Sequence, residues 1–117
     1  MAVAANVVIG LIAVLHVWFL VLEMFLWNKP LGLRTFGMTQ AEADSSAVLA
    51  ANQGLYNGFL AAGLGWSLWI NFLPAKVFFL ICVLAAGVFG GLTARRSILY
   101  IQALPAALGL ILLYVAR

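Results

Sequence analysis

The fold is decided by residues 7–27, which read VVIGLIAVLHVWFLVLEMFLW and include only two ionisable side chains, His16 and Glu23. A helix needs about 20 predominantly apolar residues to cross the hydrocarbon core of a bilayer. The stretch is long enough for that, and it has neither the basic leading region of a signal peptide nor a clear cleavage site. We therefore predict that it forms a retained transmembrane helix.

The composition of the whole chain extends this prediction. Of its 117 residues, 67% are hydrophobic and only 8% are charged, whereas a soluble domain has about 25% charged residues. Lipid therefore replaces water around an apolar exterior. Such a length holds at most about four or five spanning helices, which leaves no room for a second, soluble domain. The six Lys and Arg residues do not cluster on one element, so we expect no nucleic-acid partner.

Three further apolar stretches are long enough to span a membrane: residues 48–73, 77–93 and 98–116. The first link, residues 28–46, is polar, whereas Pro74–Lys76 and Arg95–Arg96 have the composition of short turns. Short links make neighbouring helices antiparallel. The sequence thus predicts an all-α, four-transmembrane-helix, up-down-up-down bundle, with residues 1–117 forming a single integral membrane domain.

The polar link contains one helix-start signal. Residues Thr39-Gln40-Ala41-Glu42 have the spacing of a capping box, which predicts a helix that leads into the second span. The sequence leaves open whether residues 28–46 form a lid over a site or lie on the membrane surface.

Basic residues predict the orientation of the bundle. Four of them fall in the first and third links: Lys29, Arg34, Arg95 and Arg96. Lys76 and Arg117 fall on the face that holds both termini. Because cytoplasmic loops carry an excess of Lys and Arg, we expect the termini outside and the first link in the cytoplasm.

The residues that could carry chemistry gather at one predicted depth. One stripe of the second span is polar and consists of Asn52, Gln53, Tyr56 and Asn57. Glu23, Tyr100 and Gln102 fall in the same leaflet, near the cytoplasmic ends of the first and fourth spans. His16 precedes Glu23 by seven residues, which is roughly 10 Å of helical rise on the same face. A charged or amide side chain inside a membrane is costly unless it is paired, and it often marks a functional site.

Structural interpretations of these residues stay open. Amides on a spanning helix can serve only to join helices, at about 0.6 kcal/mol per hydrogen bond. Glu23 can reach the interface or cap a helix, and His16 can be a satisfied histidine of the bundle interior. The spacings Gly54–Gly58 and Gly87–Gly91 let helix backbones approach closely, which fits packing within one chain as well as dimerisation.

Two segments carry a resemblance to a known family. Residues 22–27 read LEMFLW and residues 50–63 read AANQGLYNGFLAAG, and the chain resembles the bacterial membrane family catalogued as domain of unknown function 1304. The resemblance implies a four-helix protein of the bacterial cytoplasmic (inner) membrane. Six residues match motif positions of that family: His16, Glu23, Asn52, Gln53, Tyr56 and Asn57. Some members carry an epimerase label, but no known epimerase site is recognisable here.

The favoured hypothesis is a small-molecule or lipid binding site in the cytoplasmic leaflet, used for proton-coupled transport, with Glu23 as its key group. Two alternatives remain. One is a membrane-embedded acid/base enzyme, isomerase- or epimerase-like, acting on a lipid-like substrate, with Glu23 and His16 as catalytic groups. The other is a structural accessory subunit. We expect no metal and no cofactor, because metal-ligand spacings and cofactor motifs are missing from the sequence. The expected partners are the bilayer and the ligand, and the sequence also allows a homo-oligomer.

Overall fold

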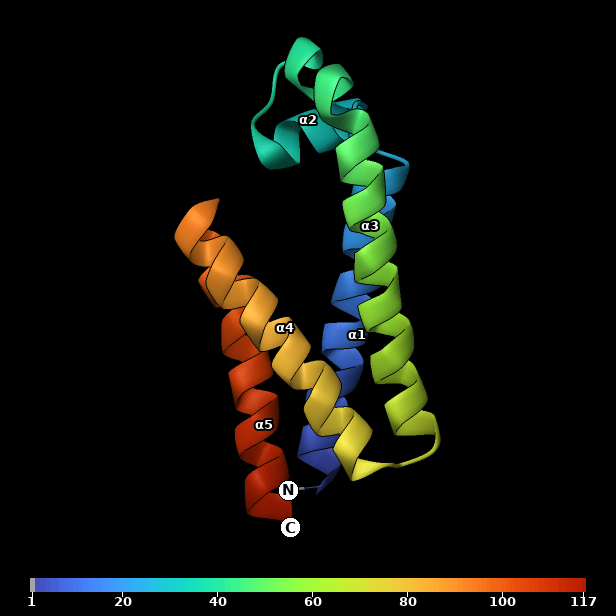
Figure 1. Cartoon of the computed structure of the whole chain (residues 1–117), viewed down its shortest axis with the longest axis vertical. Coiled ribbons are helices and arrows are strands. Elements are labelled where there is room, and N and C mark those ends of the chain that lie inside the picture. Colours follow the sequence, from blue (N-terminus) through green and yellow to red (C-terminus); the bar gives the residue numbers. More distant parts are fainter. Residues whose placement is uncertain (1) are drawn as a thin grey trace. The chain divides into compact units, whose positions relative to one another are not determined.

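The computed structural model describes residues 2–117, and every regular element among them is helical (Figure 1). The elements are α1 (Ala2–Met24), α2 (Pro30–Phe36), α3 (Gln40–Trp69), α4 (Leu73–Thr93), the π-helix η1 (Leu99–Ala103) and α5 (Leu104–Ala116). The all-α prediction is confirmed.

Three of the helices within residues 2–117 are long and apolar enough to cross a membrane. They are α1, α4 and the continuous helix Leu99–Ala116 formed by η1 and α5. α3 is the longest, at 30 residues, but within residues 2–117 it does not belong to this group. Its first half contains acids, amides and serines, which lower its hydropathy below that of the other three.

The link between α3 and α4 differs from the prediction. The structure places the turn at residues 70–72 and includes Pro74 and Lys76 in the first turn of α4, so the predicted turn at residues 74–76 is wrong. Proline suits the first helical positions because its missing N–H has no acceptor there and its φ is already helical. Asn71 takes the left-handed backbone conformation, with φ 49°, which asparagine adopts more readily than most residues.

The chain packs as two compact units. One, called here the terminal unit, comprises Met1–Val14 and Leu60–Arg117; the other, the link unit, is Leu15–Phe59. Within the terminal unit, α4 lies beside η1 and α5, as Figure 1 shows. Eight buried side chains form its core: Ala5, Ile9, Ile12, Leu64, Leu80, Val83, Ala106 and Leu113.

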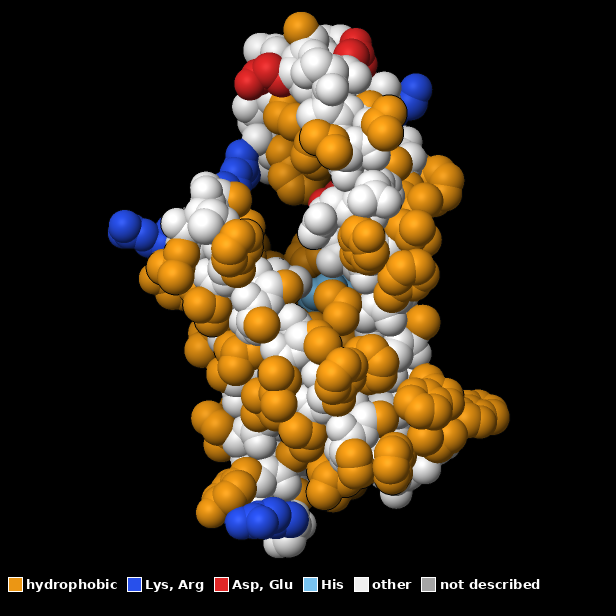
Figure 2. Space-filling model, viewed as in Figure 1, with side chains coloured by type: hydrophobic (Ala, Val, Ile, Leu, Met, Phe, Trp, Pro, Cys, Tyr) orange, Lys and Arg blue, Asp and Glu red, His pale blue; other side chains and the backbone are white. Residues whose placement is uncertain are grey.

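The outward faces of the helices are strongly apolar. Trp69, Leu92 and Val3 are 89%, 76% and 77% exposed. Figure 2 shows hydrophobic side chains over most of the visible surface along α4 and near the end of α3. In water, exposed apolar surface of this extent would be unfavourable. It matches the exterior of a protein surrounded by lipid.

The link unit is held together by local hydrogen bonds. α2 ends at Gly37, whose φ of 63° is the left-handed conformation that glycine adopts without strain, and its N–H donates to the Leu33 carbonyl. The Trp27 indole N–H donates to Ser46 Oγ at 3.0 Å and its ring packs on Phe36. These contacts join α2 and the start of α3 to the end of α1.

The predicted capping box at the start of α3 is confirmed. The Thr39 backbone N–H donates to Glu42 Oε1 at 2.9 Å, and the Glu42 N–H donates to Thr39 Oγ1 at 3.1 Å. The pKa of the Glu42 carboxyl is held below its usual value, first by the backbone N–H of Thr39 and then by its hydroxyl.

The capping box gives a prediction about pH. Because the pKa of Glu42 is lower in the folded chain, its contribution to stability is fully present above its unfolded pKa of 4.5 and is lost as the pH falls through the folded value. We expect a carbon-13 carboxyl titration to give a pKa below 4.5 for Glu42. In Thr39→Ala, the pKa of Glu42 should rise only part of the way toward 4.5, because the backbone N–H of residue 39 still donates to the carboxylate. An unchanged pKa in that variant would show that the hydroxyl has no influence.

Candidate functional site

A polar contact joins α1 to α3 inside the link unit. Asn57, in the middle of α3, donates its side-chain N–H to Oε1 of Glu23 in the last turn of α1. Asn57 is only 7% exposed, and Glu23 is partly buried. Two of the residues predicted to share a site therefore touch.

Two glycines on α3 make this contact possible. A Cβ added at Gly54 would lie 2.7 Å from Met24 Cγ and 3.1 Å from Glu23 Cβ, and one added at Gly58 would lie 2.6 Å from Leu20 Cδ1. Small residues at such positions allow helix backbones to approach closely. The Gly54–Gly58 pair is thus used for packing within the chain.

The rest of the polar stripe faces outward. Asn52, Gln53 and Tyr56 are exposed, and the Tyr56 ring meets Phe59 edge-on with centroids 5.9 Å apart. Among residues 2–117, no hydrogen bond of the Asn52 or Gln53 side chain is found. Amides with no partner are unfavourable in hydrocarbon, so this stripe is chemically unsatisfied if it lies in lipid.

His16 lies deeper in the link unit. It is fully buried, and its ring meets Phe19 edge-on at 5.3 Å between centroids. It precedes Glu23 by seven residues in one helix, which is roughly 10 Å of rise, so the two side chains do not form a catalytic pair of neighbours. A role for His16 as a second proton carrier stays a prediction.

Tyr100 and Gln102 belong to the terminal unit, on the π-helix η1. Tyr100 is 65% exposed. It lines an apolar pocket of about 320 Å³ together with residues of α4, η1 and α5: Leu84, Leu99, Ala103, Leu104 and Ala107. That Tyr100 and Gln102 share a site with Glu23 stays a prediction.

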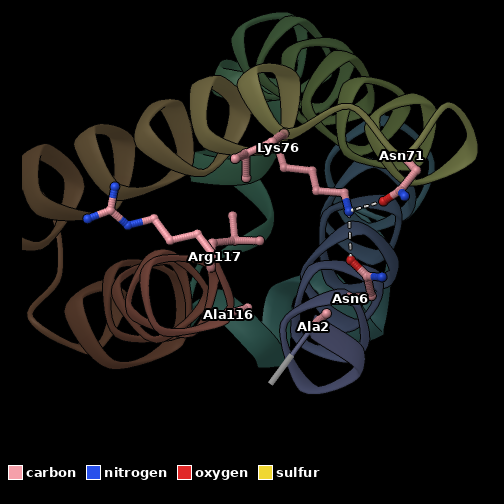
Figure 3. Close-up of a pocket in the computed structure, with 8 residues that line it drawn as sticks. Ala2, Asn6, Asn71, Lys76, Ala116 and Arg117 are labelled. Atoms are coloured by element: carbon pink, nitrogen blue, oxygen red, sulfur yellow. Dashed lines mark hydrogen bonds between the residues drawn. The ribbon is translucent and has the colours of Figure 1, made fainter.

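The structure contains a second polar cluster, which the sequence did not indicate. Lys76 of α4 is only 6% exposed, and its ammonium donates to Asn6 Oδ1 at 2.9 Å and to Asn71 Oδ1 at 2.7 Å (Figure 3). The sequence had indicated a surface turn at Lys76. One signal in the sequence could have placed Lys76 in a helix. Pro74 is typical of the first turn of a helix, and a helix that begins there includes Lys76.

Metal ligands do not gather in the described part of the chain: residues 2–117 contain no group of three or more His, Cys, Asp and Glu side chains placed to hold a metal ion. Cys82 is a free, partly buried thiol of α4.

Over the described residues 2–117 the chain is all-helical, and three of its helices are long and apolar enough to span a membrane. The chain belongs to the family described as "Protein of unknown function (DUF1304)", which matches residues 10–114; the resemblance drawn from its motifs is confirmed. It is similar to "Uncharacterized protein YpaA" of Lactococcus lactis subsp. lactis (strain IL1403). The two are 28% identical over 111 residues, which cover 91% of this chain and 93% of the relative. No solved structure matches the chain.

Proposed function

We propose that the chain is a multi-pass protein of the bacterial inner membrane, with four spans arranged up-down-up-down and both termini outside. Its second span would be the apolar later part of α3. With 30 residues, α3 measures about 45 Å, against a hydrocarbon core of about 30 Å. The short links at residues 70–72 and 94–98 support antiparallel neighbours. The amide stripe in the middle of α3 would then lie in the cytoplasmic leaflet, and the first turns of α3, with Glu42, would lie outside the hydrocarbon core.

The proposed function is to bind a polar group of a small molecule or lipid in that leaflet, beside Glu23. One observation carries it: exposed amides with no partner in the described chain lie on the same helix as the Asn57 amide that bonds Glu23. A carboxylate accepts about four hydrogen bonds, and Asn57 supplies one of them. A ligand with donors or a positive charge would satisfy both the carboxylate and the stripe.

We favour proton-coupled transport as the use of this site. A carboxyl group can bind either a proton or a cation, but not both at once. This competition couples the movement of the cation to the movement of protons. Catalysis on a lipid-like substrate requires a base within about 3 Å of the proton it removes, and usually a second group of matched chemistry. His16 lies two helical turns from Glu23. At that separation the two side chains are too far apart to act on the same substrate atom.

The test is Glu23→Gln in proteoliposomes, with tetraphenylphosphonium as the lipophilic cation and a pH gradient as the driving force. Glutamine keeps a side-chain oxygen that can accept the hydrogen bond from Asn57, but it has no negative charge and cannot bind or release a proton. We expect uptake to fall at least about tenfold, which corresponds to about 1.4 kcal/mol. The matched control is Glu42→Gln, which keeps the capping box because glutamine serves there as well. Wild-type uptake by Glu23→Gln would contradict the proposal.

A structural role is the second candidate, because Asn57 bonds Glu23 directly and two glycines bring the helices together. In that case the pair holds α1 and α3 in register, and function resides in a partner protein. The same experiment separates the two: a structural pair predicts that Glu23→Gln, which preserves the hydrogen bond, changes neither stability nor uptake.

A further inference from the structure

An open pocket of about 310 Å³ lies in the terminal unit, where the ends of several helices meet. Its lining comes from α1, α4, α5 and the turn before α4: Ala2, Asn6, Asn71, Leu73, Lys76, Leu113, Ala116 and Arg117. Its volume is at the lower end of the range of roughly 300–1,000 Å³ seen for ligand sites. Figure 3 shows Lys76 extending from α4 toward Asn6 and Asn71.

The buried cation of this pocket is bonded only to neutral groups in the contacts described. The two asparagine oxygens take two hydrogen bonds from the Lys76 ammonium, which has three donors. Amide oxygens reduce the cost of burying the ammonium, but they do not neutralise it. A buried charge is strongly unfavourable unless an opposite charge balances it.

The terminal unit contains no Asp or Glu side chain that could provide that balance. All three acidic residues, Glu23, Glu42 and Asp44, belong to the link unit, whereas four of the six basic residues belong to the terminal unit. Lys76 also lies in the first turn of α4, where the helix dipole is positive and disfavours a cation. Both effects favour an anion in the pocket.

The lining indicates which anion fits. Because the oxygens of Asn6 and Asn71 face the ammonium, their side-chain N–H groups remain as donors. A phosphate offers several acceptor oxygens to an ammonium and amide donors together. Leu73 and Leu113 add apolar walls that suit the glycerol and acyl portion of a lipid. In Figure 3 the Arg117 guanidinium points away from Lys76. Of the two cations in the lining, Lys76 is therefore the one that we expect to bind the anion.

We propose that the Lys76 pocket binds a phosphate group, carried by a phospholipid headgroup or present as free phosphate. All of its lining residues belong to the terminal unit, and the proposal does not use Glu23. It would hold the ends of α1, α3 and α4 together around one anion.

The test measures binding to the full-length protein in detergent by native mass spectrometry. Dioleoyl phosphatidylglycerol is the probe, and dioleoylglycerol, which lacks the phosphate, is its matched control. We expect Lys76→Gln to weaken phosphatidylglycerol binding at least about tenfold, since removing one member of a buried charge pair has a large effect. Lys76→Arg should retain binding, and so should Arg96→Gln, which removes a cation of the same unit outside the pocket. Binding of dioleoylglycerol should be weak and unaffected by all three substitutions.

A second arm titrates inorganic phosphate and follows its phosphorus-31 line width. Phosphatidylglycerol binding that depends on Lys76 and resists inorganic phosphate identifies the lipid headgroup as the source. Lys76-dependent binding of inorganic phosphate alone identifies the free ion. The proposal is overturned if Lys76→Gln binds both probes as the wild type does, even when its stability falls. If that variant does not fold, the proposal is tested on the wild-type protein through the nitrogen-15 NMR signal of Lys76 Nζ. The signal must shift when phosphatidylglycerol is added and must not shift with dioleoylglycerol.

Discussion

Replacing Gly54 with leucine is expected to destabilise the protein by about 2 kcal/mol and to separate Asn57 from Glu23. The new side chain would enter a space where even a Cβ lies 2.7 Å from Met24 Cγ, 3.1 Å from Glu23 Cβ and 3.3 Å from the Leu20 carbonyl oxygen. Overpacking of this kind costs about 1–3 kcal/mol. We take about 3 kcal/mol, the upper end of that range, because the carbonyl of Leu20 is among the atoms in the way. The better helix propensity of leucine returns up to about 1 kcal/mol, which leaves a net loss of about 2 kcal/mol.

The measurement is the midpoint of unfolding by SDS in mixed micelles, together with the carbon-13 carboxyl signal of Glu23. The midpoint should fall, and the signal should move as the Asn57 donor is withdrawn. Gly65→Leu is the matched control on the same helix, because no heavy atom lies within 4 Å of a Cβ built at Gly65. That control should be neutral or slightly stabilising. An equal loss of stability in both variants would mean that the approach of α3 to α1 does not depend on Gly54.

The contact of Glu23 with α3 could be predicted in part from the sequence, because its signals are local. An acid and an amide stripe are visible in single helices, and the capping box at Thr39 shows where the second helix begins. Antiparallel neighbours joined by one link place the end of one helix beside the start of the next. That geometry places Glu23 near the amide stripe of the next span. Which amide would touch the acid did not follow, because it depends on the Gly54 packing.

The Lys76 cluster could not be foreseen for two physical reasons. Pro74 was interpreted as a breaker, although a proline in the first turn of a helix requires no N–H and fits it well. The hydrogen bond between Lys76 and Asn6 joins residues 70 positions apart, which local patterns of hydropathy do not reveal. Single lysines between apolar stretches usually lie at the surface. The burial of Lys76 is therefore an exception that the sequence does not indicate.

The π-helix η1 is a further feature that hydropathy does not encode. Pro105 follows it in the first turn of α5 and cannot donate to the carbonyl four residues earlier. Its ring would also clash with that carbonyl in a regular α-helix. The Leu104 N–H donates five residues back, to the Leu99 carbonyl, and a wider turn of this type accommodates the proline.

The same π-helix underlies the second large prediction, which is that Gly87→Ala destabilises the terminal unit by about 2 kcal/mol. A Cβ at Gly87 would lie 2.5 Å from the Ala103 backbone nitrogen and 2.8 Å from its Cα. Flexible side-chain ends can move away from such a contact, but the backbone of η1 can yield only by changing its hydrogen bonds. We take about 3 kcal/mol for the overpacking, less the gain of up to about 1 kcal/mol in helix propensity.

Gly65→Ala is the control, because it brings the same gain in propensity into open space and should raise the SDS midpoint while Gly87→Ala lowers it. The pair also separates two interpretations of the Gly87–Gly91 spacing. Because Gly87 packs on Ala103 and Gly91 on Leu99, its role lies within the chain, so Gly87→Ala should lower stability without changing the mass of the particle in detergent. A change from dimer to monomer at unaltered stability would instead assign Gly87 to a contact between two copies.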